Sequence, residues 1–269
     1  MLVASWNVDG LSQRLPLVLD WCRHVRPDVL ALQETQVADL AFPGAAFAAL
    51  GYHCASAGRG SRNGVAILAR QAPNDLVVGT SGRPDTRDRV LAVTIADIRF
   101  VNVYVVNGGC RGKEEYRRKL AWLRALTPWL RGQLQRYPKL IVLGDFNITP
   151  TDIDVYDAAL WRHQVLCSPP ERCALQALMA LGLDDSFRAF ETAEGHYSWW
   201  GYGPDIYGVD VFSQNLGMRI DLILASEVLR PRLCAAYIDR GARAQDGHSD
   251  HAPVLLELAD TATVGRCAR

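Results

Sequence analysis

The feature that most limits how this chain can fold is the stretch KLIVLGDFNITPTD at residues 139–152. Its apolar run, rich in Val, Ile and Leu, predicts a short strand that is buried on both faces. Gly144 removes side-chain bulk where the run ends, and Asp145 and Asn147 follow two positions apart. In extended chain such a pair points to the same side. The stretch therefore predicts a buried strand of a sheet with a carboxylate and an amide at the end of that strand.

This polar pair admits two interpretations. Asp and Asn favour turns, so an ordinary turn at a strand end would use the same residues. A carboxylate beside an amide can also hold a water molecule or a hard cation, which prefers oxygen ligands. The other strand ends of the chain decide between the two.

Strand and helix patterns alternate along the chain and indicate an α/β fold. Residues 2–8 predict a first strand that runs into a turn, 14–26 a helix and 29–33 a buried strand that stops at Glu34. We expect further strands at 52–56, 65–70, 89–96, 99–106, 219–225 and 253–258, with a hairpin joined at 97–98, and helices at 113–136, 150–160 and 171–181. Pro128 is expected to kink or divide the long helix, and Ser168 to cap the last one.

The totals are those of an ordinary globular chain. The 269 residues, 49% hydrophobic and 22% charged, are enough for one large domain or two small ones. We predict a single domain over residues 1–259, followed by a small, polar and disordered tail at 260–269. The net charge of zero argues against a long-range, non-specific polyanion binder. It still allows a local basic groove that an acidic metal site balances.

The sequence points to the cytoplasm. We find no apolar run near the roughly 18 residues that a membrane span needs, and the N-terminus lacks the pattern of a secretory signal. The seven cysteines are scattered and form no CxxC pair, so a zinc or disulfide scaffold is not expected. We expect most of them to be small buried hydrophobes in a reducing compartment, and the protein to be a monomer with no membrane partner.

Polar side chains recur at or near the ends of the expected strands: Asn7, Asp9, Glu34, Tyr104, Asn107, Asp145, Asn147 and Asp221, with Asp250 and His251 in the loop before the last strand. Strand ends and loops are where α/β folds collect active sites. Carboxylate, amide and phenol groups without a thiolate cluster suit Mg²⁺ or Mn²⁺ rather than zinc. Taken singly, Glu34 could also be a solvated residue at a strand end. Asp250 and His251 could likewise belong to an ordinary surface loop.

Asp221 is harder to explain as a surface group, because it lies inside the apolar run 220–224. A buried carboxylate is costly unless it is paired, and His251 is a natural partner. An Asp–His pair of this kind can position the imidazole or keep it charged.

Six short motifs occur in order along the chain: WNVDG (6–10), LQET (32–35), NVY (102–104), GDFN (144–147), RID (219–221) and SDHAP (249–253). Over residues 1 to about 259 they resemble the exonuclease III / apurinic–apyrimidinic endonuclease family. GDxN and SDH are shared by the wider superfamily of DNase I-like nucleases, lipid-headgroup phosphatases and sphingomyelinases. NVDG, RID, the helix start SPPER (168–172) and DSFR (185–188) are narrower signals.

The resemblance implies a four-layer α/β sandwich, in which two packed mixed sheets are flanked by helices. It also implies a Mg²⁺ site, with Mn²⁺ as a possible substitute, in which Glu34 is the principal ligand and Asn7 and Asp9 support it. The other side of the site, where a second ion is sometimes invoked, would be lined by Asp145, Asn147, Asp250 and His251.

The implied reaction is one-step hydrolysis of a phosphodiester. A metal lowers the pKa of water and stabilises charge on the phosphate and the leaving oxygen, and donors aimed at the non-bridging oxygens matter most. Asp145 is our candidate base, and Asn147 would orient the water. His251, held by Asp221, would contact the phosphate.

The same resemblance suggests the substrate contacts. Tyr104 and Asn107 would hydrogen-bond the phosphate or assist the leaving group. Trp199 matches an aromatic wall of the pocket for a flipped-out abasic sugar, and Met218 aligns with the opposite wall; both would otherwise be ordinary core. Arg59, Arg62 and Arg111 could contact backbone phosphates of the DNA, or could be exposed loop arginines without a task.

Two loops depart from the family pattern. Val106 stands where the family usually has Pro, and Cys110 is an extra residue, which leaves the placement of Arg111 open. The loop at 203–217 is longer than in exonuclease III, which leaves open the balance between abasic-site cleavage and 3′ trimming.

We therefore expect a Mg²⁺-dependent DNA repair nuclease that acts on double-stranded DNA. It would cut 5′ to abasic sites or trim 3′ ends, and leave a 3′-hydroxyl. One alternative is a phosphatase or phospholipase of the same superfamily, acting on a small or lipid substrate; the narrow motifs and the aromatic pocket weigh against it. The other is a catalytically inactive DNA-binding module, which would have no reason to keep together Asn7, Glu34, Asp145, Asn147, Asp221 and His251.

Overall fold

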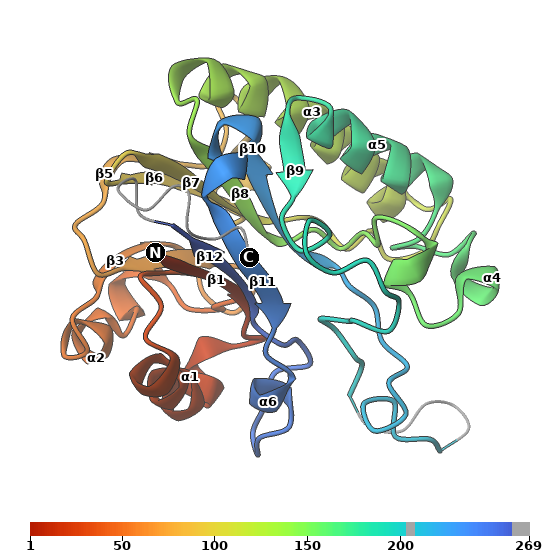
Figure 1. Ribbon diagram of the computed structural model, residues 1–269, viewed down its shortest axis with the longest axis horizontal. Coiled ribbons are helices and arrows are strands. Elements are labelled where there is room, and N and C mark those ends of the chain that lie inside the picture. Colours follow the sequence, from red (N-terminus) through yellow and green to blue (C-terminus); the bar gives the residue numbers. More distant parts are fainter. Residues whose placement is uncertain (203–207, 260–269) are drawn as a thin grey trace.

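The computed structural model describes residues 1–202 and 208–259, which form two six-stranded mixed sheets packed face to face (Figure 1). The first sheet, in spatial order, contains β11 (Leu233–Ile238), β12 (Val254–Leu258), β1 (Leu2–Asn7), β2 (Val29–Gln33), β4 (Val65–Ala69) and β3 (His53–Ala57). The second contains β5 (Asn74–Val78), β6 (Val90–Ile95), β7 (Ile98–Tyr104), β8 (Leu140–Asp145), β10 (Asp221–Ser226) and β9 (Leu183–Asp185).

Helices cover the outer face of each sheet. The longer ones are α1 (Leu11–Val25), α3 (Glu114–Arg136) and α5 (Pro169–Met179), and the short ones are α2 (Gly44–Ala48), α4 (Ala158–Trp161) and α6 (Arg240–Arg243). In Figure 1, α1 and α2 lie beside the first sheet, and α3 and α5 lie beside the second. The predicted four-layer α/β sandwich is therefore confirmed. No helix in the described ranges has both the length and the apolar character that a membrane crossing requires.

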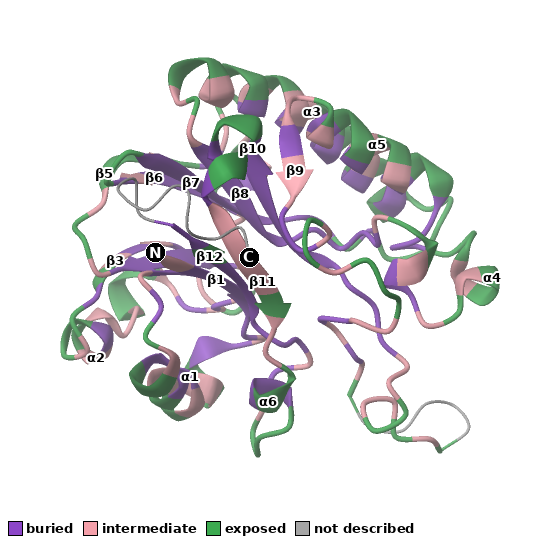
Figure 2. Ribbon diagram, viewed as in Figure 1, coloured by how far each residue is buried: buried purple, intermediate pink, exposed green. Residues whose placement is uncertain are grey.

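Three apolar clusters hold the layers together. One lies between the sheets and takes side chains from both, such as Val3 and Phe100. A second packs Trp122 and Leu126 of α3 against the second sheet, and a third packs Val18 of α1 against the first. Figure 2 shows the result: the inner strands are buried, the edge strands β9 and β11 are mainly of intermediate burial, and the helices are buried only on the side that faces a sheet. Burial of this kind supplies most of the free energy of folding.

Strand direction brings polar residues of both sheets to one rim. β1 and β2 run parallel and pair Asn7 with Gln33, and β7 and β8 run parallel and pair Tyr104 with Asp145. β10 runs antiparallel to β8 and begins at Asp221, directly opposite Asp145. The carboxyl ends of four strands and the start of a fifth therefore meet at the same edge.

Gly144 is needed for this arrangement. It has a φ of 145°, and a Cβ at this position would lie 1.9 Å from the backbone oxygen of Val103 on β7. No other residue type allows the two backbones to approach so closely just before Asp145.

Several sequence expectations about secondary structure are wrong. Residues 150–160 form a 3₁₀ turn (Asp152–Asp154) and the start of the short α4, because Val155 between them is extended and its backbone pairs with that of Met218. The hairpin turn falls at residues 96–97, since Ile95 pairs with Ile98. Pro128 lies inside α3 without dividing it, whereas the expected capping of α5 by Ser168 is confirmed.

Three strands, β5, β9 and β11, were not expected; each lies at the edge of its sheet and lacks a long buried run. The cysteines also differ from expectation. Six lie in the described part as free thiols, but only Cys22 and Cys167 are buried. The expected disordered tail lies outside the described residues, as do residues 203–207 of the long loop.

Candidate active site

A cavity of about 190 Å³ opens at the rim where the strand ends meet. All but two of the residues that line it, Leu166 and Ile220, were singled out from the sequence. The full lining is Glu34, Tyr104, Asn107, Asp145, Asn147, Leu166, Trp199, Ile220, Asp250 and His251. The two sheets thus bring together residues that are up to 217 positions apart in the chain, from Glu34 to His251.

Asn7 bridges two carboxylates at the base of this cavity. Its side-chain amide donates to Oε1 of Glu34 and to Oδ2 of Asp145, each at 3.0 Å. The hydroxyl of Tyr104 donates to the same Glu34 oxygen at 2.8 Å. Glu34 and Asp145, which come from different sheets, therefore lie within reach of one shared group.

Asp145 is held by the turn that follows it. The backbone N–H of Asn147 donates to its Oδ1 at 2.8 Å, and the side-chain amide of Asn147 donates to its Oδ2 at 3.1 Å. Burial raises the pKa of Asp145 to about 7; His251 opposes the rise, and the carboxylates of Asp221 and Glu34 add to it. A carboxyl group with a pKa near neutrality is suited to accept and release a proton under physiological conditions.

His251 is paired with Asp221 on the other side of the cavity. Its Nδ1–H donates to Oδ2 of Asp221 at 2.8 Å, and the buried hydroxyl of Ser198 donates to the same oxygen at 2.7 Å. Burial alone lowers the pKa of His251, but the surrounding carboxylates, Asp221 foremost, raise it to about 10. The imidazole is therefore a cation at neutral pH, and its Nε2 lies 3.9 Å from Oδ1 of Asp250.

The cavity carries more negative than positive charge. Glu34, Asp145 and Asp250 line it, Asp221 lies directly behind His251, and no Lys or Arg is among the lining residues. Ligand atoms of Asp145, Asp221 and His251 also lie within 4.8 Å of one another. Buried carboxylates in excess need a compensating cation, and an oxygen-rich donor set fits a hard divalent ion. The residues present therefore fit a metal, for which Glu34 and Asp145, both bonded to the amide of Asn7, offer carboxylate oxygens.

The turns that aim these side chains are strained. Glu34 has a φ of 50° and Asn147 a φ of 51°, in the left-handed region that most residues avoid. Backbone hydrogen bonds hold both turns, from Gly10 N to Glu34 O at 2.8 Å and from Phe146 N to Ile220 O at 2.9 Å. Strain of this kind persists where the surrounding structure over-determines the backbone, and it is frequent at functional sites.

Asn7 and Asp9 were expected to support a metal, but their side-chain oxygens accept hydrogen bonds from other groups. Asp9 forms an ion pair with Arg14 at 3.0 Å, accepts a hydrogen bond from Tyr202 at 2.6 Å and does not line the cavity. The side-chain oxygen of Asn7 accepts from the backbone N–H of Asp9, so that its NH₂ group faces the carboxylates. In this conformation Asn7 is a hydrogen-bond donor within the site.

The structure places Met218 in the core and Ile220 at the cavity. Met218 is 1% exposed and packs with Val155 and Leu166, while Trp199 lines the cavity and donates its indole N–H to Asp250 at 2.9 Å. Met218 and Ile220 are two positions apart, so alternation in an extended chain gives both the same side. That spacing is the signal that would have identified Ile220.

None of the three arginines expected at the DNA backbone lies in this cavity. Arg59 donates to the backbone oxygen of Pro84, Arg62 is exposed, and Arg111 donates to the backbone oxygen of His163. Arg111 lines a neighbouring cavity of about 350 Å³, which shares Asn107 and Leu166 with the first. Arg111 is thus the one of the three that borders the site.

Comparisons with protein families, with curated proteins and with solved structures all point to nucleases or phosphatases of one kind. The model of the Endonuclease/Exonuclease/phosphatase family matches residues 4–251. Exodeoxyribonuclease III of Haemophilus influenzae is 32% identical over 96% of this chain and 100% of its own length. Among solved structures, the 3′ phosphatase NExo from Neisseria bound to product DNA hairpin has a TM-score of 0.92 and 38% identity, and an AP endonuclease from Archaeoglobus fulgidus has a TM-score of 0.91 and 32% identity. Both cover 97% of this chain and 100% of the other.

Proposed function

This chain belongs to the endonuclease/exonuclease/phosphatase family, and from that premise we propose that it is a divalent-metal-dependent nuclease that hydrolyses phosphodiester bonds in DNA. Its substrate is double-stranded DNA with a 3′ end or an abasic site, and its product carries a 3′-hydroxyl. The enzyme acts as a monomer in the cytoplasm, to which its free cysteines are suited.

The observation that carries this proposal is the excess of carboxylates around one imidazolium in a small cavity. The negative groups suit a divalent cation, and the imidazolium suits the phosphate that such a cation would neutralise.

The residues have separate tasks in this scheme. Glu34, whose carboxylate the amide of Asn7 fixes, would hold a Mg²⁺ ion, for which Mn²⁺ could substitute. Such an ion would lower the pKa of water and stabilise charge on the phosphate. Asp145 takes the proton from the attacking water, which Asn147 orients. His251 donates from Nε2 to a non-bridging phosphate oxygen, where negative charge builds up during in-line displacement. Tyr104 and Asn107 lie on the same cavity wall, within reach of the phosphate or the leaving oxygen.

The relatives suggest two substrates for one site. One similar protein is described as a 3′ phosphatase and another as an AP endonuclease. The decisive experiment incubates this protein and Mg²⁺ with two end-labelled duplexes, one with a recessed 3′ end and one with an abasic analogue. We expect cleavage of at least one, none after chelation of the metal, and none by a folded Glu34→Ala variant. Hydrolysis of phosphoinositides with both duplexes intact would favour the phosphatase alternative instead.

A further inference from the structure

A fully buried lysine lies directly behind the cavity, and the scheme above gives it no task. Lys119, in the first half of α3, donates from its ammonium to the backbone oxygen of Asn107 at 3.0 Å, to the backbone oxygen of Asn147 at 2.6 Å and to Oε1 of Glu171. All three partners are acceptors, so the nitrogen must carry three hydrogens. Lys119 is therefore charged, and each of its N–H groups has one partner.

These partners belong to three segments that form the cavity wall. Asn107 follows β7 and Asn147 follows β8, and both line the cavity. Oε1 of Glu171 also accepts from the backbone N–H of Leu166 at 3.1 Å, and Leu166 lines the cavity too. One ammonium group thus connects the backbones of three separate wall segments.

The side chains at the site depend on these backbone positions. The amide of Asn107 donates to the side-chain oxygen of Asn147 at 2.9 Å, and the amide of Asn147 donates to Oδ2 of Asp145. Asn147 has the left-handed φ noted above, and its carbonyl bond to Lys119 stabilises that conformation. A continuous series of hydrogen bonds therefore leads from the ammonium to Asp145.

Stability alone does not account for a charged pair at this place. Two charges taken out of water lose hydration, and replacing such a pair by well-packed apolar residues is often neutral or stabilising. The lysine stem is also closely packed, since a Cβ at Gly108 would lie 2.9 Å from Cδ of Lys119. The fold therefore maintains a tightly fitted charged pair where apolar residues at both positions could hold the layers together.

We propose that Lys119 is a positioning residue for the hydrolysis, which holds the turns after β7 and β8 so that Asn107 and Asn147 face Asp145 in the reactive arrangement. It acts through the backbone and does not touch the substrate. The inference rests on the nuclease function proposed above.

A matched pair of variants tests this role. The control is Arg99, a second buried cation, which lies near the start of β7 and contacts the far end of α3. It donates to Gln133 at 3.1 Å and to the backbone oxygen of Asp75 at 2.6 Å. Lys119→Met and Arg99→Met each remove one buried charge, and steady-state cleavage of the recessed duplex is measured per folded molecule. We expect Lys119→Met to lower kcat roughly 100-fold with KM within about threefold, because a misplacement near 1 Å costs about that much. Arg99→Met should keep kcat within about twofold.

Hydrogen exchange of the metal-free and DNA-free proteins gives a second readout, independent of activity. Exchange should become faster at 105–109 and 147–151 in Lys119→Met and stay unchanged there in Arg99→Met. Should Lys119→Met fail to fold, the double variant Lys119→Met/Glu171→Gln removes both charges and keeps a polar side chain at the start of α5. A folded variant with wild-type kcat, a change in KM alone, or unchanged exchange in both turns would overturn the proposal. A wild-type protein that leaves both duplexes intact would refute the nuclease function instead, and the exchange data would still decide whether Lys119 holds the turns.

Discussion

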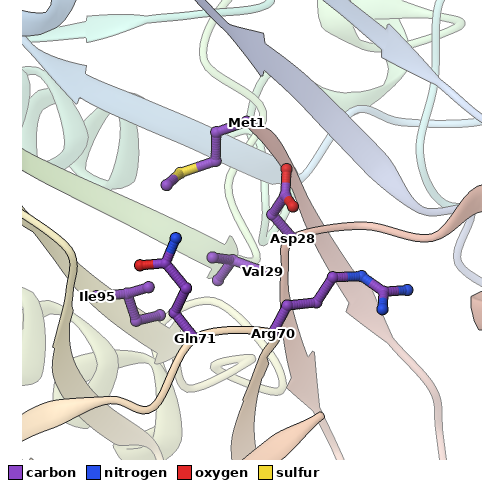
Figure 3. A pocket seen from close by; sticks show the side chains of 6 residues that line it. All are labelled: Met1, Asp28, Val29, Arg70, Gln71 and Ile95. Atoms are coloured by element: carbon purple, nitrogen blue, oxygen red, sulfur yellow. The ribbon is translucent and has the colours of Figure 1, made fainter. Parts of the chain in front are cut away.

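The charged side chains are paired differently at the two ends of the strands. At the opposite rim a cavity of about 240 Å³ is lined by Met1, Asp28, Val29, Arg70, Gln71 and Ile95 (Figure 3). There each charge has a partner of its own: Asp28 accepts from the backbone N–H of Leu2 at 2.7 Å, and the guanidinium of Arg70 lies 4.6 Å from the ring centroid of Tyr52.

At the active rim, in contrast, several carboxylates share one imidazolium. Burial and neighbouring carboxylates raise the pKa of Asp145 to about 7, so its negative charge is not fully compensated, whereas the same surplus of carboxylates stabilises the His251 cation and raises its pKa to about 10. Buried groups held in this way are characteristic of functional sites, whereas individually paired charges are characteristic of structural ones. The candidate active site therefore differs from the opposite rim less in the number of its charged groups than in how incompletely those groups are paired.

The largest effect should come from removing a carboxylate at each rim in turn. Glu34→Ala should lower kcat/KM for DNA by at least roughly 10³-fold, because it removes the residue that we assign to the metal, while the protein stays folded. Asp28→Ala, at the opposite rim, should leave kcat/KM within about twofold. The measurement is cleavage of end-labelled duplex with circular dichroism as the folding control, and equal losses in both variants would contradict the comparison.

The next effect concerns the imidazolium. His251→Gln keeps a hydrogen-bond donor but loses the charge, so kcat should fall by roughly 10²- to 10³-fold, as for other donors aimed at developing negative charge. Single-turnover kinetics separate this loss in the chemical step from a loss in binding. A variant with normal single-turnover rates would show that His251 has no part in the chemistry.

Metal binding should stabilise the fold through the active rim only. At a free Mg²⁺ concentration about 100 times its dissociation constant, the free energy of unfolding should rise by roughly 2.7 kcal/mol. Thermal melts with and without Mg²⁺ measure the effect. Glu34→Ala should lose it and Asp28→Ala should retain it; an equal stabilisation of both variants would place the ion elsewhere.

The last effect is a pH dependence of stability in the metal-free protein. The folded pKa of His251, about 10, lies above its ordinary value of 6.5, so the folded state binds the proton more tightly than the unfolded state. Its contribution to stability is therefore fully present below about pH 6.5 and is lost as the pH rises through 10. Urea unfolding at pH 7 and pH 10 should show this decrease in the wild type and a smaller one in His251→Gln. An equal decrease in the free energy of unfolding from pH 7 to pH 10 in the two proteins would mean that the Asp221–His251 pair does not stabilise the charged imidazole.

Much of this organisation was readable from local pattern. The buried runs of β2 and β8, the capping of α5 by Ser168 and Glu171 and the turn after Gly144 all follow from neighbouring residues. The resemblance to exonuclease III and AP endonucleases, read from six motifs, is confirmed by the comparisons. The roles of the individual site residues remain predictions that the variants above test.

Other features could not be read in this way, because they depend on partners far away in the chain. The single helix expected at 150–160 is interrupted because the extended Val155 pairs its backbone with Met218, 63 positions further on. Asp9 turns away from the cavity toward Arg14 and Tyr202, and Ile220 rather than Met218 forms part of the wall. Nothing in the local pattern of the helix expected at 113–136 distinguishes Lys119 from the other charged residues there, because its three acceptors belong to other segments.

Hydrophobic periodicity and turn preference act over a few residues, so the order of amino acids is enough to predict which chemical groups stand at the ends of the strands. Which of those groups meet, which are neutralised by a neighbour and which are left in excess depends on the folded arrangement, because pairing and burial are set by contacts between the two sheets and their covering helices. Those contacts join segments that no local pattern connects.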